Sequence, residues 1–292
     1  MRIAELVSRI LPEGQYKEGL RRIFYDYHNP LYPVNKIIGQ SALCPDGMLF
    51  IRLNNGFQCY GLPDGGEYNN SFRFGYGNPQ KLDRLNAVFG LFYYHLYEQF
   101  IQNIYEREYH LQKGDVAIDV GAAFGINAII YSKQVGDEGK VISIEPAEDN
   151  LMCLKKNIEL NKLKNVTVIQ KGLWSKKDRL RFYLKPVPGG HSLVTDKDDA
   201  VRITEVEVDT LDNILTELGI YRVNFIKMDI EGAEIEALRG MEETLENNDV
   251  KLAIASYHKV NGQPTYKTII PMMREMGFNF HFKDGISYFE KW

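Results

Sequence analysis

The stretch VAIDVGAAFGINAII, Val116–Ile130, decides the fold class of this 292-residue chain. Its first residues are apolar or β-branched around a single Asp, which is typical of a buried strand. Gly121 and Gly125 then form a Gly-x-x-x-Gly turn, and an apolar, helix-like run follows. A strand that leads through a glycine turn into a helix commonly binds a nucleotide, so the stretch predicts a ligand site.

Beyond residue 110, predicted strands and helices alternate. This alternation predicts an α/β fold with a doubly wound, mainly parallel sheet. The last two predicted strands have no helix between them, which favours an antiparallel last strand. The expected strands are Val116–Val120, Lys140–Glu145, Val166–Gln170, Val223–Asp229, Lys251–Ser256, Phe278–Phe282 and Ile286–Phe289, with an inserted strand pair at Arg179–Leu184 and Val201–Val208; the expected helices are Ile126–Val135, Ala147–Asn161, Leu211–Leu218, Ala233–Arg239 and Thr265–Met276.

The composition changes near residue 110. Residues 1–110 hold 20 of the 35 aromatic residues and predict a short strand at Met48–Leu53 and a long helix over 83–108. We therefore expect an aromatic-rich α+β region over 1–110, acting as a cap or substrate region, and a ligand-binding domain over 111–292. Three aromatic residues that alternate with polar ones could stack on a sugar ring or form a half-buried strand. They are Phe72, Phe74 and Tyr76.

The charge and the cysteine content of the chain limit which binding partners and which cell compartment we expect. The net charge is -4, and residues 1–110 carry 11 basic and 11 acidic side chains, so no basic surface for nucleic acid is expected. The three cysteines form no Cys-x-x-Cys pair, which favours a reducing cytoplasm. Charged residues interrupt the first apolar residues, so no signal peptide is expected. The most apolar run, AVFGLFYYHLY, has 11 residues and is too short to span a membrane.

The glycine turn lacks the motifs of the common phosphate-binding loops. It contains neither Gly-x-Gly-x-x-Gly nor Gly-Lys-Ser/Thr. Asp119 is expected at the lip of the turn, where a carboxylate would repel a pyrophosphate and favour a cationic ligand. Gly121 and Gly125 would let the backbone pass close to that ligand, although a plain tight turn needs the same residues.

A second acid strengthens the case for a ligand. Glu145 ends the next strand, 20 residues after Gly125, and Pro146 opens the following helix. A carboxylate at this position can accept both hydroxyls of a ribose. An acid at each of two strand ends fits a nucleoside that carries a positive group and no phosphate. S-adenosylmethionine has a sulfonium, an ammonium and free ribose hydroxyls, and it is the cofactor we expect.

The motifs DVGAAFG, IEP and FIKMDIEGAEIEALRG resemble the FkbM family of S-adenosylmethionine-dependent methyltransferases. The resemblance covers about residues 110–282. It implies the class I methyltransferase fold, a Rossmann-like seven-stranded sheet with an antiparallel last strand, and methyl transfer to a hydroxyl oxygen of a sugar, glycan or small natural product. This chain has GAAFG where the family more often has Gly-Ala-Asn-x-Gly, so Asn127 could supply an amide instead. The expected cofactor-binding residues are Asp119, Gly121, Ala122, Gly125, Asn127, Glu145, Pro146 and Gly172.

Three side chains near two neighbouring strand ends are candidates for catalysis. Asp229 ends one strand, Glu231 follows it, and His258 lies just past the next strand. Adjacent strands lie about 4.8 Å apart, so these side chains can converge on one hydroxyl. We expect Asp229 to orient the hydroxyl or the imidazole, and His258 to take the proton with a pKa near 6.5 if unperturbed.

Other interpretations of the same residues remain open. Asp229 could itself be the base or could contact the cofactor, and His258 could be structural. Glu231 and Glu234 could only favour a helix N-terminus. Carboxylates and imidazole can also bind a metal, but we expect none here. His191 could be a solvated loop residue or part of a mobile lid over residues 183–200.

Two other enzyme classes and one binding function compete with a methyltransferase. An NAD-dependent oxidoreductase uses a similar sheet but needs the pyrophosphate glycines that this chain lacks. A nucleic-acid methyltransferase needs a basic channel. A non-enzymatic protein could use the aromatic N-terminal region for binding, although Asp119, Glu145 and Asp229 argue against a decayed site. The acceptor and the oligomeric state are not readable from the sequence.

Overall fold

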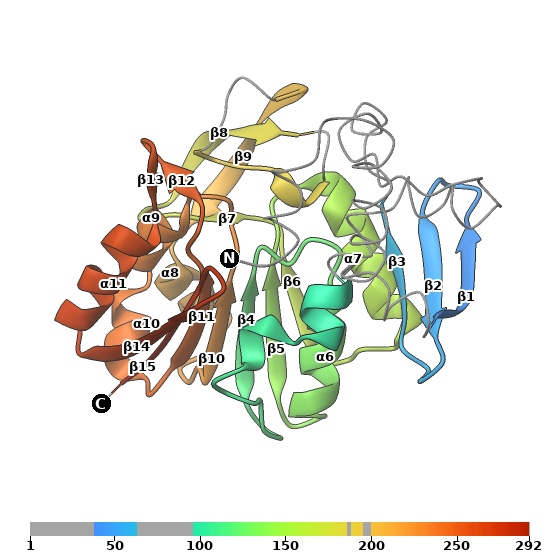
Figure 1. The fold of residues 1–292 in the computed structure, drawn as a ribbon, viewed down its shortest axis with the longest axis horizontal. Coiled ribbons are helices and arrows are strands. Elements are labelled where there is room, and N and C mark those ends of the chain that lie inside the picture. The colour runs from blue at the N-terminus through green and yellow to red at the C-terminus, as the bar shows by residue number, and fades with distance from the viewer. Residues whose placement is uncertain (1–37, 63–95, 186–187, 195–199, 292) are drawn as a thin grey trace, which may run out of the picture.

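The computed structural model describes residues 38–62, 96–185, 188–194 and 200–291. The strands of its central sheet are β4 (Val116–Val120), β5 (Lys140–Ile144), β6 (Val166–Ile169), β10 (Phe225–Met228), β11 (Lys251–Ala255), β14 (Phe278–Lys283) and β15 (Ile286–Lys291). These seven strands lie in the order β14-β15-β11-β10-β4-β5-β6 (Figure 1). The sheet begins at its centre with β4, reaches one edge at β6 and resumes beside β4 with β10. The order therefore reverses between β4 and β10, where doubly wound sheets bind ligands.

The direction of the strands confirms a doubly wound sheet with an antiparallel last strand. β11, β10, β4, β5 and β6 pair in parallel, whereas β15 is antiparallel to both β11 and β14. Only Asp284 and Gly285 separate β14 from β15, with φ of 51° and 84°. Positive φ at both residues is typical of the tight turn of a β-hairpin, which explains why the last strand reverses.

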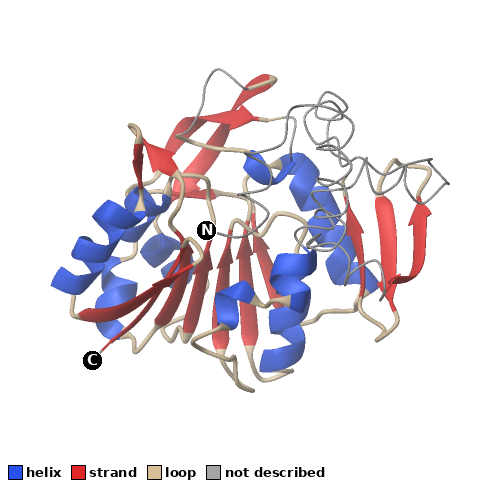
Figure 2. Ribbon diagram, in the orientation of Figure 1, coloured by secondary structure: helices blue, strands red, loops and turns tan. Residues whose placement is uncertain are grey.

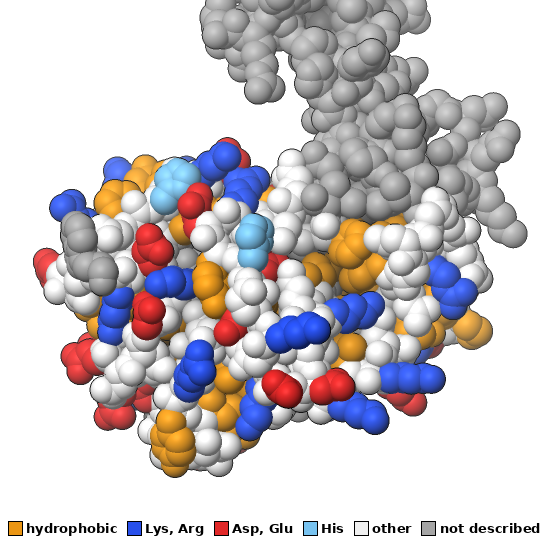
Figure 3. All heavy atoms as spheres, turned by 90° about the horizontal axis from the view of Figure 1, so that it is seen from below, with side chains coloured by type: hydrophobic (Ala, Val, Ile, Leu, Met, Phe, Trp, Pro, Cys, Tyr) orange, Lys and Arg blue, Asp and Glu red, His pale blue; other side chains and the backbone are white. Residues whose placement is uncertain are grey.

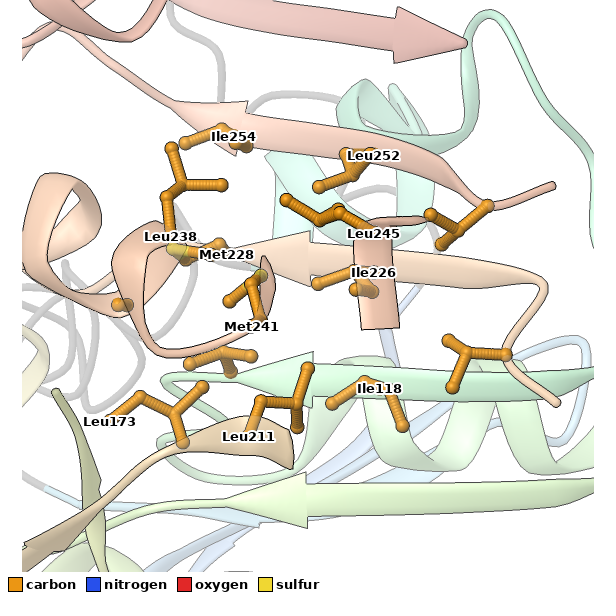
Figure 4. Close-up of a cluster of buried hydrophobic side chains, with 14 of the residues drawn as sticks. Ile118, Leu173, Leu211, Ile226, Met228, Leu238, Met241, Leu245, Leu252 and Ile254 are labelled. Carbon is orange, nitrogen blue, oxygen red and sulfur yellow. The ribbon is translucent and has the colours of Figure 1, made fainter. Parts of the chain in front are cut away.

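Helices cover both faces of the sheet (Figure 2). They are α6 (Ile126–Val135), α7 (Glu148–Leu160), α8 (Leu211–Glu217), α9 (Glu234–Arg239), α10 (Glu242–Asn247) and α11 (Tyr266–Glu275). Successive side chains of a strand point to opposite faces. In β4, Ile118 packs into a core with α8, α9 and α10 (Figure 4). Ala117 belongs to a second core that contains Tyr131 of α6.

The strands and helices expected after residue 110 are confirmed to within two residues at their ends. The sequence did not predict α10 or three very short strands: β7 (Gly172–Leu173), β12 (Lys259–Val260) and β13 (Gln263–Pro264). Two-residue strands are defined by their partners, so hydrophobic periodicity cannot reveal them.

The described part of the N-terminal region begins with a three-stranded antiparallel sheet beside α7 (Figure 1). Its strands are β1 (Ile38–Leu43), β2 (Leu49–Leu53) and β3 (Gln58–Gly61). Asn157 of α7 joins the two units, since its side chain accepts from Tyr60 N at 2.6 Å and donates to Tyr60 O at 2.9 Å. Leu49 and Ile51 share a buried core with Ile129 of α6.

The prediction of one long helix over residues 83–108 is wrong for the residues of this range that the structure describes. Residues 96–101 form a π-helix, η2 (Leu96–Ile101), and a separate 3-10 turn follows at η3 (Ile104–Glu106). Asn103 between them has φ 47°, a left-handed conformation that ends a right-handed helix. Residues 83–95 lie outside the described residues, as do Phe72, Phe74 and Tyr76.

The insert after β6 is a small three-stranded sheet of order β7-β9-β8. It contains the predicted antiparallel pair, β8 (Asp178–Leu184) and β9 (Arg202–Asp209), and a 3-10 turn, η4 (Pro188–Gly190). Ser192 returns to β8 and exchanges two backbone hydrogen bonds with Tyr183, at 2.8 and 3.1 Å. Much of the expected lid lies at residues 186–187 and 195–199, outside the described residues, so its mobility stays a prediction.

Two surface properties bear on the choice of partners. None of the helices that the structure describes is long and apolar enough to cross a membrane. On the face shown in Figure 3, basic and acidic side chains of the described residues are interspersed. Among the described residues, this face offers no continuous positive track for a nucleic-acid backbone.

Candidate active site

A cavity lies at the carboxyl ends of β4, β5 and β10, where the order of the sheet reverses. It encloses about 520 Å³ including its open mouth. Of the residues expected in the site, Gly121, Glu145, Pro146, Gly172, Asp229 and Glu231 line this cavity; Asp119, Ala122, Gly125, Asn127 and His258 do not. The far wall comes from the insert and includes Phe182, His191 and Leu193.

The glycines of the turn are required by packing as well as by any ligand. Gly121 has φ 73°, and a Cβ there would lie 1.9 Å from the carbonyl oxygen of Asp229. A Cβ on Gly125, which has φ 81°, would lie 2.3 Å from the Leu154 side chain. The turn therefore packs against the end of β10 at Gly121 and against α7 at Gly125. The packing on α7 explains why Gly125 has no side chain.

Asp119 does not stand at the lip of the turn. Its side chain has no exposed surface, and Lys227 Nζ lies 3.1 Å from its Oδ1 atom. Burial raises the pKa of Asp119, while Lys227 and the buried Asn127 act in the opposite direction. The ammonium of Lys227 also donates to the carbonyl oxygens of Val120 and Gly121, at 3.2 and 2.7 Å. The sequence analysis placed Asp119 at the lip and did not predict its pairing with Lys227, so the charge of Asp119 by itself does not explain a preference for a cationic ligand.

Glu145 occupies the place expected of it, at the end of β5 against the glycine turn. Its Oε2 atom accepts from Ala123 N at 2.9 Å, and its Oε1 atom accepts from Ala147 N at 2.9 Å and Asn150 Nδ2 at 3.3 Å. Ala123 has φ 44°, a left-handed conformation that is uncommon outside glycine. Burial raises the pKa of Glu145, and these three hydrogen bonds oppose the effect. They hold the carboxylate in one orientation at the cavity wall.

His191 lies on the Glu145 side of the cavity. Lys185 N donates to its Nδ1 atom at 3.0 Å, so in the neutral ring the proton is on Nε2. That Nε2 atom lies 3.7 Å from an oxygen of Asp149, and its proximity lowers the pKa of Asp149. Phe182 packs edge-on against the ring, with centroids 5.9 Å apart. His191 is thus held by the Lys185 backbone and by packing against Phe182.

Asp229, Glu231 and His258 converge as predicted from the ends of neighbouring strands. His258 Nε2 lies 3.5 Å from both Asp229 Oδ1 and Glu231 Oε1. The phenol of Tyr105, from η3, donates to Asp229 Oδ2 at 2.7 Å. Glu231 has φ 54°, and the hydroxyl of Ser192 donates to its carbonyl oxygen at 2.7 Å.

Glu234 has a larger role than the predicted helix N-terminus. Its side chain has no exposed surface, and its Oε1 atom lies 2.9 Å from His258 Nδ1. The same oxygen accepts from the backbone N–H groups of Ile230 and Gly232, each at 3.2 Å. Glu234 therefore fixes both the loop that carries Glu231 and the orientation of the imidazole.

The acid cluster changes the charge expected for His258. Burial by itself lowers the pKa of His258, but its interactions with Glu231 and Glu234 and the charge of Asp229 raise it to about 11. The imidazole is therefore cationic at neutral pH in this structure. The pKa near 6.5 expected of an unperturbed His258 does not apply, because Glu234 joins Asp229 and Glu231 around the ring and the sequence analysis did not predict its contact with His258.

The sequence analysis did not predict the contribution of three residues to the site. They are Lys227, Tyr105 and Glu234, whose buried contact with His258 was not expected. Lys227 and Glu234 both lie inside the KMDIEGAE motif. For Lys227 the sequence did carry a signal, because a lysine within an otherwise apolar strand is rarely buried without a partner. Tyr105 is 124 residues away from Asp229 in the chain and carries no local signal.

The doubly wound sheet, its antiparallel last strand and the cavity at its switch point together define the class I methyltransferase fold. The chain belongs to the FkbM methyltransferase family, because the model of the methyltransferase FkbM domain matches residues 119–280.

The chain is similar over part of its length to several methyltransferases. The chain is 29% identical over 164 residues to methyltransferase sdnD of Sordaria araneosa, covering 46% of this chain and 63% of that protein. It is 27% identical over 148 residues to the hexuronic acid methyltransferase AglP of Haloferax volcanii, covering 50% and 57%. The chain thus spans about three fifths of these relatives. A solved methyltransferase FkbM from Methylobacillus flagellatus KT is 22% identical with a TM-score of 0.43, covering 62% of this chain and 45% of that chain.

Proposed function

We propose that this protein is an S-adenosylmethionine-dependent methyltransferase that methylates a hydroxyl oxygen of a sugar, glycan or small natural product. The observation that carries the proposal is the Glu145 carboxylate, fixed at the cavity wall beside the glycine turn in a chain of the FkbM family. In this proposal residues 111–292 form the cofactor-binding domain and residues 1–110 cap the acceptor side.

The Glu145 carboxylate sets how the ribose would bind. A carboxylate has about four lone-pair directions, and backbone and Asn150 donors use three of them. Oε2 accepts one of these hydrogen bonds and Oε1 accepts two, so Oε2 has more capacity to accept a further hydrogen bond. We therefore assign one ribose hydroxyl to Oε2, a more restricted contact than the predicted acceptance of both hydroxyls. Gly121, Pro146 and Gly172 leave space around the nucleoside, because all three line the same cavity.

Asp229 and Glu231 also line the cavity, and in this proposal the methyl acceptor approaches them. The acceptor oxygen attacks the methyl carbon while the sulfur leaves, and the hydroxyl proton must be lost. Positioning can supply roughly 7–11 kcal/mol of the barrier reduction, and a general base adds about 10²- to 10⁴-fold. We assign the base to the pair of carboxylates, with Asp229 held by Tyr105 and Glu231 more open to the acceptor. His258, as a cation, then acts as a positioning residue that keeps the two carboxylates together.

The acceptor class is inferred from chemistry and from one relative. A pair of carboxylates that can accept from a hydroxyl suits a polyol such as a sugar. The name of the Haloferax volcanii relative specifies a hexuronic acid methyltransferase, which supports a sugar-type acceptor here.

The proposal can be tested by titrating the full chain with S-adenosylhomocysteine and with NAD in a calorimeter. We expect binding of S-adenosylhomocysteine and no binding of NAD. Methyl transfer from isotopically labelled S-adenosylmethionine to a panel of monosaccharides, uronic acids and glycans is then followed by mass spectrometry. NAD binding in place of S-adenosylhomocysteine would favour the oxidoreductase alternative and refute the proposal.

A further inference from the structure

The structure brings three potential metal ligands from two loops into one cluster. Asp229 follows β10, Glu231 precedes α9, and His258 follows β11. One atom from each side chain can be chosen so that all three lie within 4.8 Å of one another. The cluster consists of two carboxylates and one imidazole. Its two carboxylates line the cavity where the proposed function places the acceptor.

The imidazole of His258 has the arrangement of a metal-binding histidine. Its side chain is only 6% exposed, and its Nε2 atom lies 3.5 Å from each carboxylate, beyond the usual 2.7–3.2 Å of an N–H···O hydrogen bond. Its other nitrogen, Nδ1, lies 2.9 Å from the fully buried Glu234 carboxylate. Metal-binding histidines almost always donate the second ring N–H to a carboxylate or carbonyl, which points the other nitrogen at the ion.

The separations also suit one shared ion. Two ligand atoms about 2.1 Å from an ion, at 90–110° to each other, are roughly 3.0–3.5 Å apart. The two measured nitrogen–oxygen separations, both 3.5 Å, lie at the upper end of this range. The third separation, between the two carboxylates, is at most 4.8 Å, so binding of one ion would draw these two side chains closer together.

Neighbouring groups hold the carboxylates in place. Tyr105 donates to the Oδ2 atom of Asp229, while Oδ1 faces His258. Ser192 and Glu234 hold the backbone on either side of the Glu231 side chain. The cluster is thus supported by residues from the N-terminal region, the insert and α9.

We propose that Asp229, Glu231 and His258 form a binding site for one divalent cation of the Mg²⁺ or Mn²⁺ kind. Two carboxylates favour such oxygen-preferring ions, and the imidazole widens the choice towards transition metals such as Mn²⁺. Three protein ligands leave positions for water or for an acceptor hydroxyl. The ion takes the place that the second ring proton of His258 holds in the metal-free chain. This site goes beyond the proposed methyl transfer, which does not require it.

The test is a titration of the chelator-treated full chain with Mn²⁺, followed by electron paramagnetic resonance of the free ion. We expect one bound Mn²⁺ per chain, at least tenfold weaker binding in Glu231→Gln, and competition by Mg²⁺. The matched control is Glu236→Gln. Its side chain is 28% exposed against 26% for Glu231, and it pairs with Arg239 instead of the cluster, so it should bind Mn²⁺ like the wild type.

A direct signature of the ligand set is the nitrogen coupling of the bound Mn²⁺. Pulsed resonance should detect one ¹⁴N coupling in the wild type, and His258→Gln should lose it. Glu234→Gln keeps the three ligands and should weaken binding about 10- to 100-fold. A wild-type chain that is folded by circular dichroism and binds no Mn²⁺ up to millimolar concentrations overturns the proposal. So does binding that Glu231→Gln leaves unchanged, or a nitrogen coupling that survives His258→Gln.

Failure of this site and failure of the proposed function are distinguishable in the same samples. Calorimetry with S-adenosylhomocysteine is run on the chelated chain. Binding of S-adenosylhomocysteine without Mn²⁺ binding overturns only the metal site. Mn²⁺ binding with the expected signature, in a chain that ignores S-adenosylhomocysteine, supports the metal site and overturns the proposed function.

Discussion

Lys227 and Asp119 face each other in register across β10 and β4, with the ammonium 3.1 Å from the carboxylate and both side chains at most 2% exposed. The pair lies directly under the glycine turn, because the same ammonium donates to the carbonyl oxygens of Val120 and Gly121. One lysine therefore neutralises a buried acid and fixes the turn that borders the cavity.

Lys227→Met should destabilise the protein by about 3–5 kcal/mol, since removing one partner leaves an uncompensated buried charge. Chemical denaturation followed by circular dichroism measures the loss. Asp119→Leu combined with Lys227→Met should cost less than the sum of the two single changes. As a control, Lys156→Met removes a partly exposed pair with Asp46 and should cost about 0–1 kcal/mol. Strict additivity of the two buried substitutions would show that the pair does not act as a unit.

Gly121→Ala should damage both stability and the cavity, because the new Cβ would lie 1.9 Å from the carbonyl oxygen of Asp229. Gly114→Ala is the matched control, since Gly114 has φ 85° against 73° but no atom within 4 Å of the added Cβ. Left-handed strain alone costs about 1–3 kcal/mol. We expect Gly114→Ala to lose only this amount and Gly121→Ala to lose clearly more, in parallel denaturation experiments. Equal losses would mean that the turn can move away from β10.

Glu145→Gln should weaken S-adenosylhomocysteine binding roughly tenfold or more, because a hydrogen bond to a charged acceptor contributes about 1.5–3 kcal/mol. Isothermal calorimetry gives the affinity directly. The exposed neighbour Glu148 on α7 provides the control, and Glu148→Gln should bind like the wild type. Unchanged affinity in a folded Glu145→Gln protein would remove the ribose assignment.

Tyr105→Phe should lower kcat/KM for methyl transfer by about tenfold to a hundredfold, since Asp229 loses a donor worth roughly 1.5–3 kcal/mol. Tyr109→Phe is the matched control. The Tyr109 phenol donates to Asp115 at the same distance, 2.7 Å, and Asp115 precedes β4 instead of lying in the acid cluster. Both changes should cost stability, but only Tyr105→Phe should reduce turnover at unchanged affinity for S-adenosylhomocysteine. A similar loss of turnover in both proteins would point to general destabilisation.

Thiol labelling should distinguish Cys44 from the other two cysteines. Burial raises the pKa of Cys153 to about 12 and raises that of Cys59 well above its usual value, so neither forms a thiolate near neutral pH. Cys44 is partly exposed. At pH 8 a disulfide reagent should therefore label one thiol in the folded protein and three after denaturation. Rapid labelling of all three in the folded state would contradict the shared core of β2, β3, α6 and α7.

The sequence by itself determined the elements and their order. The apolar run of β4, the glycines after it and the alternation of strands with helices are local patterns, so they predicted the doubly wound sheet and the reversal at β15. They also placed Glu145 and Asp229 at strand ends and His258 just past one, because each of them comes after a largely apolar run.

Tertiary structure decided what charge those groups carry and which groups they meet. Only the register of β10 on β4 pairs Lys227 with Asp119, and only the packing of α9 and η3 brings Glu234 and Tyr105 to His258 and Asp229. Protonation depends on burial and on charges a few ångströms away in space. Residues more than a hundred positions apart supply some of those neighbours, and hydrophobic periodicity carries no information about such contacts.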